Sequence, residues 1–337
     1  MHYLFKQTDR DFVILNLTDV QLCECQWDKN DPGYDNSFDV MDHTVRTLIQ
    51  RVKPDLITVT GDMSSCDQPK AYPAFADYID AFDIPWCVTW GNHDQQEPEG
   101  IAFVDTILPY YRSCKNFIHE DGDPALGNGN YLIGIKEGDA VVHTLFMVDS
   151  HNCVYLPDEN GEPKFAYAKL NEAQLCWYQE QAAWLKEQGC TKSSVLMHIP
   201  IYAYNDAWKA AFREDLDPNA VTLEQSYGAD CWNEGYEDSF GVRYEGICSY
   251  PYEDGVFAVI KEAGITQNVI VGHDHNNNFA ICYQGVNLVF ATKTGKGCYW
   301  KNPVNGGTVL TIGADGSSKI HHEYVDVNHL LQPYDFK

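Results

Sequence analysis

Basic side chains are scarce in this sequence. Of its 337 residues, 23 are lysine or arginine and 49 are aspartate or glutamate, which gives a formal net charge of −26. Nucleic-acid-binding proteins draw most of their affinity from basic side chains that neutralise phosphates, and no basic stretch is present here. The composition therefore argues against a nucleic-acid partner and against an anionic membrane surface.

Long apolar runs and several common site motifs are also missing. No stretch approaches the roughly 20 apolar residues that a membrane-spanning helix needs, and the acidic start of the chain, with Asp9 and Asp11, is unlike a secretory signal peptide. The 12 cysteines include no Cys-x-x-Cys pair, which argues against zinc-ribbon and thioredoxin-like sites. The Gly-x-x-x-x-Gly-Lys-Ser/Thr loop of P-loop NTPases is absent too. We expect a cytoplasmic protein without a membrane partner, whose cysteines are mostly reduced.

Apolar residues, by contrast, are abundant. The chain is 44% hydrophobic and 13% aromatic, which is enough for a packed core and argues against intrinsic disorder. Short apolar runs rich in β-branched residues predict buried strands at Phe12–Leu17, Leu56–Val59, Trp86–Thr89, Val141–Val148, Ser194–Met197 and Asn268–Val271. Helical spacing of apolar residues predicts helices at Val40–Val52, Leu170–Gln188 and Gly255–Ala263. This alternation predicts an α/β class with largely parallel strand pairing.

Two later regions depart from this alternation. Closely spaced strands with glycine-containing turns predict antiparallel hairpins in Phe279–Tyr283, Val286–Phe290, Thr308–Ile312 and Lys319–Val325. The segment Tyr202–Tyr252 has weak periodicity, apart from one expected helix near Asp206–Arg213. Long irregular segments inside a domain are usually functional or mobile. We therefore expect this segment to form loops over an active-site mouth, with its aromatic side chains mainly packed onto the domain.

Five short polar motifs each follow a predicted strand. They are Thr18-Asp19-Val20-Gln21, Gly61-Asp62, Gly91-Asn92-His93-Asp94, His198-Ile199-Pro200 and Gly272-His273-Asp274-His275. Side chains that leave the ends of strands in α/β folds converge in one crevice. Oxygen and nitrogen donors of this kind suit divalent first-row metals, and they number enough for two metals that share one carboxylate: Asp19, Gln21, Asp62, Asn92, His198, His273 and His275.

Taken together and in this order, the five motifs resemble the signature of the calcineurin-like metallophosphoesterase superfamily. Each motif alone is weak, since a Gly-Asp after a strand is usually a turn, but the joint match from residue 19 to 275 is specific. Closer likeness is to the purple-acid-phosphatase-like branch that is not purple, on the residues Gly127–Tyr131, Met147–Ser150, Met197–Ile201, Tyr244–Gly246, Val271–Phe279 and Thr294-Gly295. The resemblance implies a four-layer α/β/β/α sandwich of two mixed sheets, with residues 1–337 forming one domain.

The resemblance also implies a role for each motif residue. The first metal would be held by Asp19, Gln21, Asp62 and His275. The second metal would be held by Asp62, Asn92, His198 and His273, with Asp62 as the bridge. His93 would be the catalytic histidine, which stabilises the phosphoryl oxygens or protonates the leaving alkoxide.

Two positions differ from the pattern of the superfamily. Gln21 stands where the first motif usually has histidine, so it either coordinates through its amide oxygen or leaves that metal site weak. An oxygen donor favours manganese or iron(II), with zinc or nickel as further candidates. Ser65 stands where purple enzymes have a tyrosine and Ser/Thr protein phosphatases have an aspartate, which argues against both of these branches.

Three further residues are weaker candidates for substrate contact. Asp94 follows His93 and either orients it or caps the next helix. His151 lies after the strand Val141–Val148 and would reach a phosphate from the rim of the site, or belong to a surface loop. Asn277 lies in a turn after the last histidine motif, where it could help to hold a ligand.

These residues predict metal-dependent hydrolysis of a small phosphate ester. Two metals about 3.5–4 Å apart can hold a bridging hydroxide that attacks phosphorus in line, so no covalent phosphoenzyme is expected. Phosphodiesterase activity on cyclic nucleotides or other small diesters is the alternative within enzymes. A non-catalytic scaffold with the same fold is a second alternative, which the intact His93 disfavours.

Overall fold

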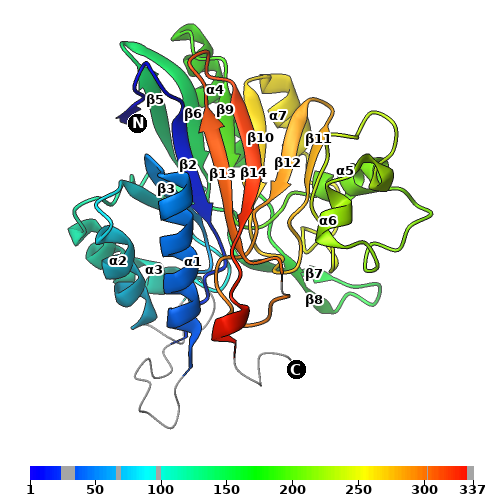
Figure 1. Cartoon of the computed structure of the whole chain (residues 1–337). Coiled ribbons are helices and arrows are strands. Elements are labelled where there is room, and N and C mark those ends of the chain that lie inside the picture. Colours follow the sequence, from blue (N-terminus) through cyan, green and yellow to red (C-terminus); the bar gives the residue numbers. More distant parts are fainter. Residues whose placement is uncertain (24–34, 66–69, 96–99, 302, 332–337) are drawn as a thin grey trace.

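The computed structural model describes residues 1–23, 35–65, 70–95, 100–301 and 303–331. Two β-sheets lie face to face in the middle of the molecule (Figure 1). Helices cover the outer face of each sheet, so the order of layers is α/β/β/α, as predicted.

The larger sheet has seven strands of mixed direction. In spatial order they are β1 (His2–Phe5), β5 (Tyr131–Glu137), β6 (Ala140–Met147), β9 (Ser193–Leu196), β10 (Thr266–Val271), β12 (Val286–Phe290) and β11 (Ala280–Tyr283). The central strands β6, β9, β10 and β12 run parallel to one another. The edge pair β11 and β12 is an antiparallel hairpin, as predicted.

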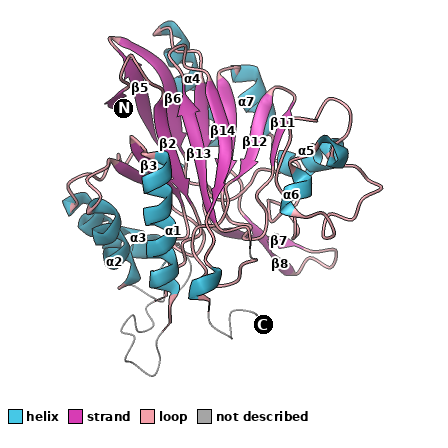
Figure 2. Ribbon diagram, viewed as in Figure 1, coloured by secondary structure: helices cyan, strands magenta, loops and turns pink. Residues whose placement is uncertain are grey.

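The smaller sheet has five strands and is mixed as well. In spatial order they are β14 (Ser318–Tyr324), β13 (Gly306–Ile312), β2 (Phe12–Leu17), β3 (Leu56–Thr60) and β4 (Trp86–Thr89). β2, β3 and β4 are parallel, while β13 pairs antiparallel with both of its neighbours. A separate two-stranded hairpin, β7 (Cys153–Pro157) and β8 (Pro163–Tyr167), projects from the sandwich (Figure 2).

The helices fall into two groups. The five-stranded sheet is covered by α1 (Ser37–Val52), α2 (Ala71–Asp80) and α3 (Gly100–Ser113). The seven-stranded sheet is covered by α4 (Glu172–Glu187), α5 (Ala203–Ala211) and α7 (Val256–Ala263). Shorter helical turns are η1 (Pro124–Leu126), α6 (Leu223–Ser226), η2 (Ala229–Cys231) and η3 (Asn328–Leu330).

Three apolar clusters hold these layers together. One lies between the two sheets and includes Ile14 and Leu310 from one sheet and Leu196 and Ile270 from the other. The remaining clusters join each sheet to its own helices. Burial on both faces explains why the central strands appear in the sequence as short, largely apolar runs.

Most predicted elements are confirmed within three residues of their observed bounds. Phe12–Leu17, Trp86–Thr89 and Val286–Phe290 have the predicted bounds. Within 202–252, the expected helix is α5, but residues 203–232 do not lie over a site mouth. Their aromatic rings, including Tyr204, Trp208 and Trp232, are buried against the seven-stranded sheet. The expectation of loops near the site holds for residues 244–252 only.

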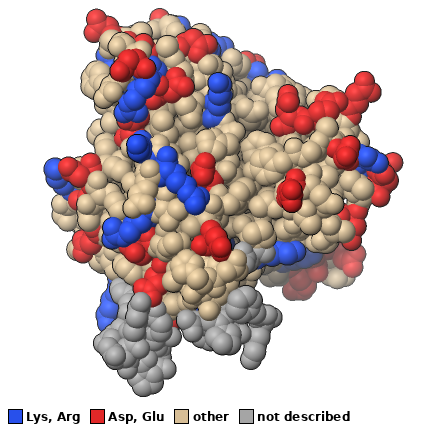
Figure 3. Space-filling view, viewed as in Figure 1, with Lys and Arg blue, Asp and Glu red and all other residues tan. Residues whose placement is uncertain are grey.

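The charge on the surface follows the acidic composition of the chain (Figure 3). Acidic side chains are spread over the face that Figure 3 shows and gather over the α5–α6 region at the right of the view. Among the described residues, no helix has the length and apolar character to cross a bilayer. No disulfide joins the cysteines in this part of the chain.

Candidate metal centre

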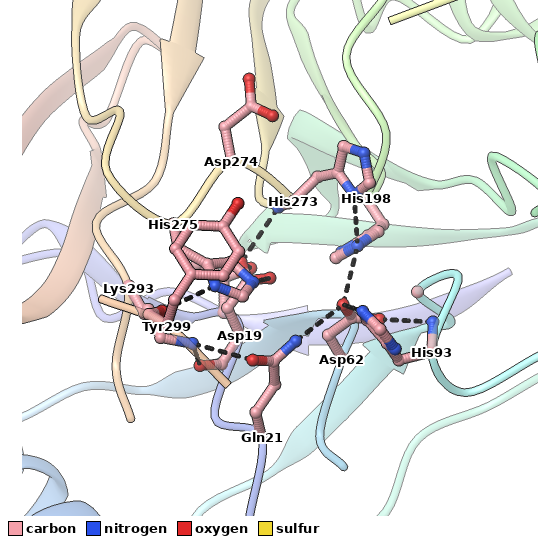
Figure 4. Close-up of polar contacts among 12 residues, drawn as sticks. Asp19, Gln21, Asp62, His93, His198, His273, Asp274, His275, Lys293 and Tyr299 are labelled. Carbon is pink, nitrogen blue, oxygen red and sulfur yellow. Dashed lines mark hydrogen bonds and ion pairs between the residues drawn. The ribbon is translucent and has the colours of Figure 1, made fainter. Parts of the chain in front are cut away.

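The five polar motifs converge at one edge of the sandwich. Asp19, Asp62 and Asn92 follow the neighbouring parallel strands β2, β3 and β4. His198 and His273 follow β9 and β10, which are neighbours in the other sheet. Figure 4 shows the side chains from both sheets pointing toward one another. The sequence argument about strand ends therefore describes the observed arrangement.

Backbone strain is concentrated in these motifs. Asp19, Gln21, Asp62 and His273 have φ values of 49°, 43°, 54° and 79°. Residues with side chains rarely adopt this left-handed region, and such strain gathers at functional sites. It is supported by close packing of glycine backbone, since a Cβ atom on Gly91 would overlap the Asp62 carboxylate.

Asp62 lies at the centre of the group. Its Oδ1 accepts a hydrogen bond of 2.9 Å from the backbone N–H of His93. Its Oδ2 lies 3.4 Å from Nε2 of His198 and 4.0 Å from Nε2 of His93. The Nε2 of Gln21 donates to the same oxygen at 3.2 Å. This carboxylate thus touches both sets of proposed ligands, as a bridging residue must.

Hydrogen bonds to carbonyl oxygens orient two of the histidines. Nδ1 of His198 lies 2.7 Å from the carbonyl oxygen of Thr60, and Nδ1 of His275 lies 2.8 Å from that of Tyr299. A carbonyl only accepts, so each Nδ1 carries the proton and each Nε2 can serve as a ligand atom. Nε2 of His275 lies 3.4 Å from Oδ1 of Asp19. Both rings therefore turn Nε2 toward the carboxylates.

The two remaining ligand candidates, His273 and Asn92, lie next to His198. Nδ1 of His273 lies 3.3 Å from Nε2 of His198, and Oδ1 of Asn92 lies 3.1 Å from the same nitrogen. We call Asp19, Gln21, Asp62 and His275 the first half-site. Asp62, Asn92, His198 and His273 form the second half-site. All seven residues are buried.

The donors present fit divalent metal ions. Ligand atoms of Asp19, Asp62 and His275 lie within 4.8 Å of one another. Within the described part of the chain, Oδ1 of Asp19 is buried without a hydrogen bond. A buried carboxylate oxygen is costly to leave unsatisfied, and a cation between it and the facing histidine nitrogen would satisfy it. Mixed oxygen and nitrogen donors suit manganese, iron or zinc.

Electrostatics support the same assignment. Burial opposes charge on Asp62, but the neighbouring His198 outweighs it and lowers the pKa of the carboxyl to about 2. Burial likewise opposes charge on His198, and the Asp62 carboxylate outweighs it, raising the pKa of the imidazole to about 10. Burial and the adjacent His198 together lower the pKa of His273 to about 3. The carboxylates are therefore ionised and attract cations.

The amide oxygen of Gln21 faces a buried lysine. Lys293 is 2% exposed, and its Nζ donates to the amide oxygen of Gln21 at 3.2 Å and to the carbonyl of Asp19 at 2.8 Å. The amide nitrogen of Gln21 donates to Asp62. A flipped amide would set N–H groups against the ammonium and oxygen against the carboxylate. The network therefore determines the orientation (Figure 4), and the amide oxygen faces Lys293.

The three weaker candidates lie around the centre without facing the ligands. Asp94 is 0% exposed, and its carboxylate accepts from the backbone N–H groups of Asp62 and Gly91 and from the hydroxyl of Tyr72. Burial, followed by the charge of Asp62, raises the pKa of Asp94 to about 7. Asp94 thus holds the loops of Asp62 and Gly91 together, and its contact with a substrate stays a prediction.

His151 and Asn277 also make structural contacts. Nε2 of His151 lies 2.7 Å from the amide oxygen of Gln174, which belongs to the first turn of α4. Asn277 is buried, donates to the Asp274 carboxylate and accepts from the backbone N–H of Glu245. Asn277 thus fixes segment 244–248 to the last histidine motif, and its contact with a ligand stays a prediction.

His93 occupies a different environment from the ligands. Its side chain is 28% exposed, whereas those of Asp62 and His198 are at most 1% exposed. Its backbone is tied to Asp62 by the bond described above. The imidazole is therefore held at the mouth of the centre, where a substrate would enter.

Several residues of the site were not predicted. Lys293 follows β12, and only its neighbours Thr294 and Gly295 carried a sequence signal. Cys248 lies beside His273 and Asp274, with ligand atoms within 4.8 Å. The ring of Tyr167 lies edge-on to His273 at 4.3 Å between centroids. These contacts join segments that are distant in the sequence, so no local spacing pattern could have indicated them.

The fold and the centre define a metallophosphoesterase. Residues 12–277 match the calcineurin-like phosphoesterase family, and the chain belongs to this family. Among solved structures, a dimetal phosphatase from Danio rerio has a similar fold, with a TM-score of 0.53 over 93% of this chain and 99% of that one. The sequence identity is 13%, so this likeness concerns the fold alone.

Two curated relatives carry names from the purple acid phosphatase branch, and a third is named a phosphatase. The chain is 27% identical to "Probable inactive purple acid phosphatase 14" of Arabidopsis thaliana, over 86% of this chain and 71% of the relative. It is 25% identical to "Probable inactive purple acid phosphatase 29" of the same plant, over 75% and 63%. It is 23% identical to "Phosphatase DCR2" of Saccharomyces cerevisiae, over 71% and 40%. The match thus spans between two fifths and about seven tenths of these relatives.

Proposed function

We propose that this protein hydrolyses small phosphate monoesters with the help of two divalent metal ions. The observation that supports this most directly is the orientation of His198 and His275 by backbone carbonyls, which turns their Nε2 atoms toward ionised, buried carboxylates. A chain that served only as a scaffold would not need this preorganisation of ligand atoms. The relatives named inactive make activity itself the property to test.

Three side chains would hold the first metal and four the second. Asp19, Asp62 and His275 supply the first half-site, because Gln21 presents its oxygen to Lys293. Asp62, Asn92, His198 and His273 supply the second. When bound, two divalent ions would activate water at neutral pH and stabilise negative charge on the phosphoryl oxygens. The oxygen-rich first half-site favours manganese or iron(II).

The chain's own residues then act on the leaving group and the geometry. In the hydrolysis, a bond forms between a water oxygen and phosphorus while the water gives up a proton to solvent, the ester P–O bond breaks, and the departing alkoxide takes up a proton. His93 lies at the exposed mouth and donates this proton to the alkoxide oxygen. Asp94 and Gln21 keep Asp62 in place, and the burial of the ligands excludes bulk water from them.

An activity panel on the metal-reconstituted protein tests this function. Aryl phosphate and bis-aryl phosphate are each supplied with manganese, iron(II), zinc or nickel, and release of the aryl alcohol is measured. Hydrolysis of the monoester, lost when the metal is chelated, is the expected result. Preference for the diester would make the protein a phosphodiesterase. Full metal content without hydrolysis of either ester would identify a non-catalytic scaffold.

A further inference from the structure

A broad hollow lies beside the metal centre. It has a volume of about 720 Å³ and opens between the hairpin β7–β8 and the segment 248–252. Its walls include Phe165 and Tyr167 from the hairpin and Cys248 and Tyr252 from the segment. This volume is in the range of pockets that hold small molecules.

The hollow reaches the second half-site through two of its wall residues. Tyr167 lies edge-on to His273, with ring centroids 4.3 Å apart. Cys248 lies next to His273 and Asp274, and its backbone N–H faces both carboxylate oxygens of Asp274 at 3.2 and 3.3 Å. A phosphate ester held at the metals could therefore extend its alcohol part into this hollow.

Aromatic rings are exposed on both sides of the hollow. Phe165 is 51% exposed and Tyr252 is 61% exposed. Single exposed aromatics are ordinary on protein surfaces, but these two face one hollow that adjoins a candidate active site. Phe165 also contacts Tyr167 edge-on at 5.2 Å, so rings lead from the outer wall to the ligand His273.

The two walls are anchored at their bases. The backbone N–H of Ala168 donates to the carbonyl of Asn152, which closes the hairpin. The side chain of Asn152 donates to the carbonyl of Gln95, just after the Asn92 motif. On the other wall, the ammonium of Lys169 lies 5.3 Å from the ring of Tyr250. The hairpin is thus tied to the residue after the Asn92 motif, and the segment that carries Tyr252 is tied to the chain just after the hairpin.

We propose that this hollow binds the alcohol part of the substrate and that this part carries an aromatic or heteroaromatic ring. Aryl and nucleoside phosphate monoesters are the classes that fit. The charged wall residues Asp158, Glu159 and Lys164 are of both signs, which suits an uncharged ring better than a polyanion. Rings that stack between aromatic side chains gain affinity without specific hydrogen bonds to the ring. The inference rests on the proposed function of the same centre.

Steady-state kinetics on wall variants test the inference. KM and kcat are measured for an aryl phosphate, a nucleoside 5′-phosphate and glycerol phosphate with the wild type, Phe165→Ala, Tyr252→Ala and the double variant. Loss of stacking should raise KM for at least one ring-bearing ester by about 5–50-fold in the double variant, with KM for glycerol phosphate changed less than about twofold. Phe5→Ala is the matched control, because Phe5 is an exposed phenylalanine on β1 that does not line the hollow.

Equal KM changes for ring-bearing and ring-free esters, or no change, would overturn the inference while leaving the proposed function intact. A binding arm separates the two further. Metal-loaded His93→Ala protein, with and without the two wall substitutions, is titrated calorimetrically with adenosine and with phenol. Binding of either ring compound that the wall substitutions abolish supports the hollow even if no ester is hydrolysed. Absence of binding of both compounds to the protein with intact walls contradicts it.

Discussion

The first half-site and the second half-site share Asp62 but differ in the positive charge that lies beside the metal position. Beside the first half-site, Lys293 places a buried ammonium on the carbonyl of Asp19 and on the amide of Gln21. Beside the second half-site, the positive charge in the metal-free chain is on His198, whose pKa is raised to about 10. The first is a cation next to the ligands, and the second is a proton on a ligand atom.

This difference affects how each half-site takes up metal. The proton on Nε2 of His198 must leave before that nitrogen can coordinate, so metal binding there releases a proton. The ammonium of Lys293 is not on a ligand atom and repels a metal as long as it is charged. Burial lowers the pKa of Lys293 to about 8, so it is mainly charged at neutral pH. We therefore expect the first half-site to be the weaker one.

The largest effect is expected from substitution of the residue that both half-sites share. Asp62→Asn takes a negative charge from each metal and should reduce metal content at both half-sites. Hydrolysis should fall by at least about 10³-fold, more than the 10–100-fold typical of outer-shell partners. Elemental analysis and turnover are measured beside Asp139→Asn, an exposed carboxylate in the β5–β6 turn. Two full metal equivalents in Asp62→Asn would contradict the bridging role.

A second substitution tests the role of the histidine at the mouth of the centre without removing a proposed metal ligand. His93→Ala should lower kcat by about 10²–10⁴-fold, the usual contribution of a positioned acid or base. Both metals should remain, because the His93 side chain is not among the proposed ligands. His321→Ala, an exposed histidine on β14, is the control. Unchanged turnover in His93→Ala would show that the proton comes from another donor.

The pH dependence of metal affinity sharpens the comparison directly. Between pH 6 and 7.5 the pH stays below the raised pKa of His198, so the imidazole is protonated. Each metal that binds at the second half-site should therefore release one proton. Its affinity should rise about tenfold per pH unit. The first half-site should change less in this range, because burial and then Lys293 lower the pKa of His275 below its ordinary value, which favours the neutral imidazole.

Each half-site can be measured alone by calorimetry with manganese. His275→Ala retains the second half-site, and His198→Ala retains the first. Above the pKa of Lys293, near pH 8, the ammonium loses its proton and the first half-site should begin to tighten. If metal affinity depends on pH in the same way in both variants, the proposed difference between the Lys293 ammonium and the proton on His198 is wrong.

The smallest expected effect concerns Lys293 itself. Lys293→Met removes the buried cation and frees the amide oxygen of Gln21, so manganese should bind the first half-site about tenfold more tightly. The measurement is made in the His198→Ala background at pH 7. Lys296→Met is the matched control, since Lys296 is also buried but faces Asp35. Weaker or unchanged binding in Lys293→Met would show that Lys293 helps to organise the ligands.

Much of the fold could be predicted because its central strands are buried on both faces. Phe12–Leu17 and Trp86–Thr89 are predominantly apolar runs, and both were predicted with the observed bounds. The missed elements carry weaker patterns. β5 has Gly134 in its middle, α2 and α3 contain proline, and the β7–β8 hairpin is largely exposed. Glycine, proline and exposure each remove the apolar periodicity on which prediction depends.

The sequence alone determined which residues gather at the centre, because the order of five strand-end motifs specifies both the topology and the donor types. Only the tertiary structure decided how each donor points. Gln21 turns toward Lys293, 272 residues away along the chain, and Asp94 turns beneath the loops of Asp62 and Gly91. Hydrogen bonds and charges between distant segments set these orientations, and such contacts leave no periodic pattern in the chain.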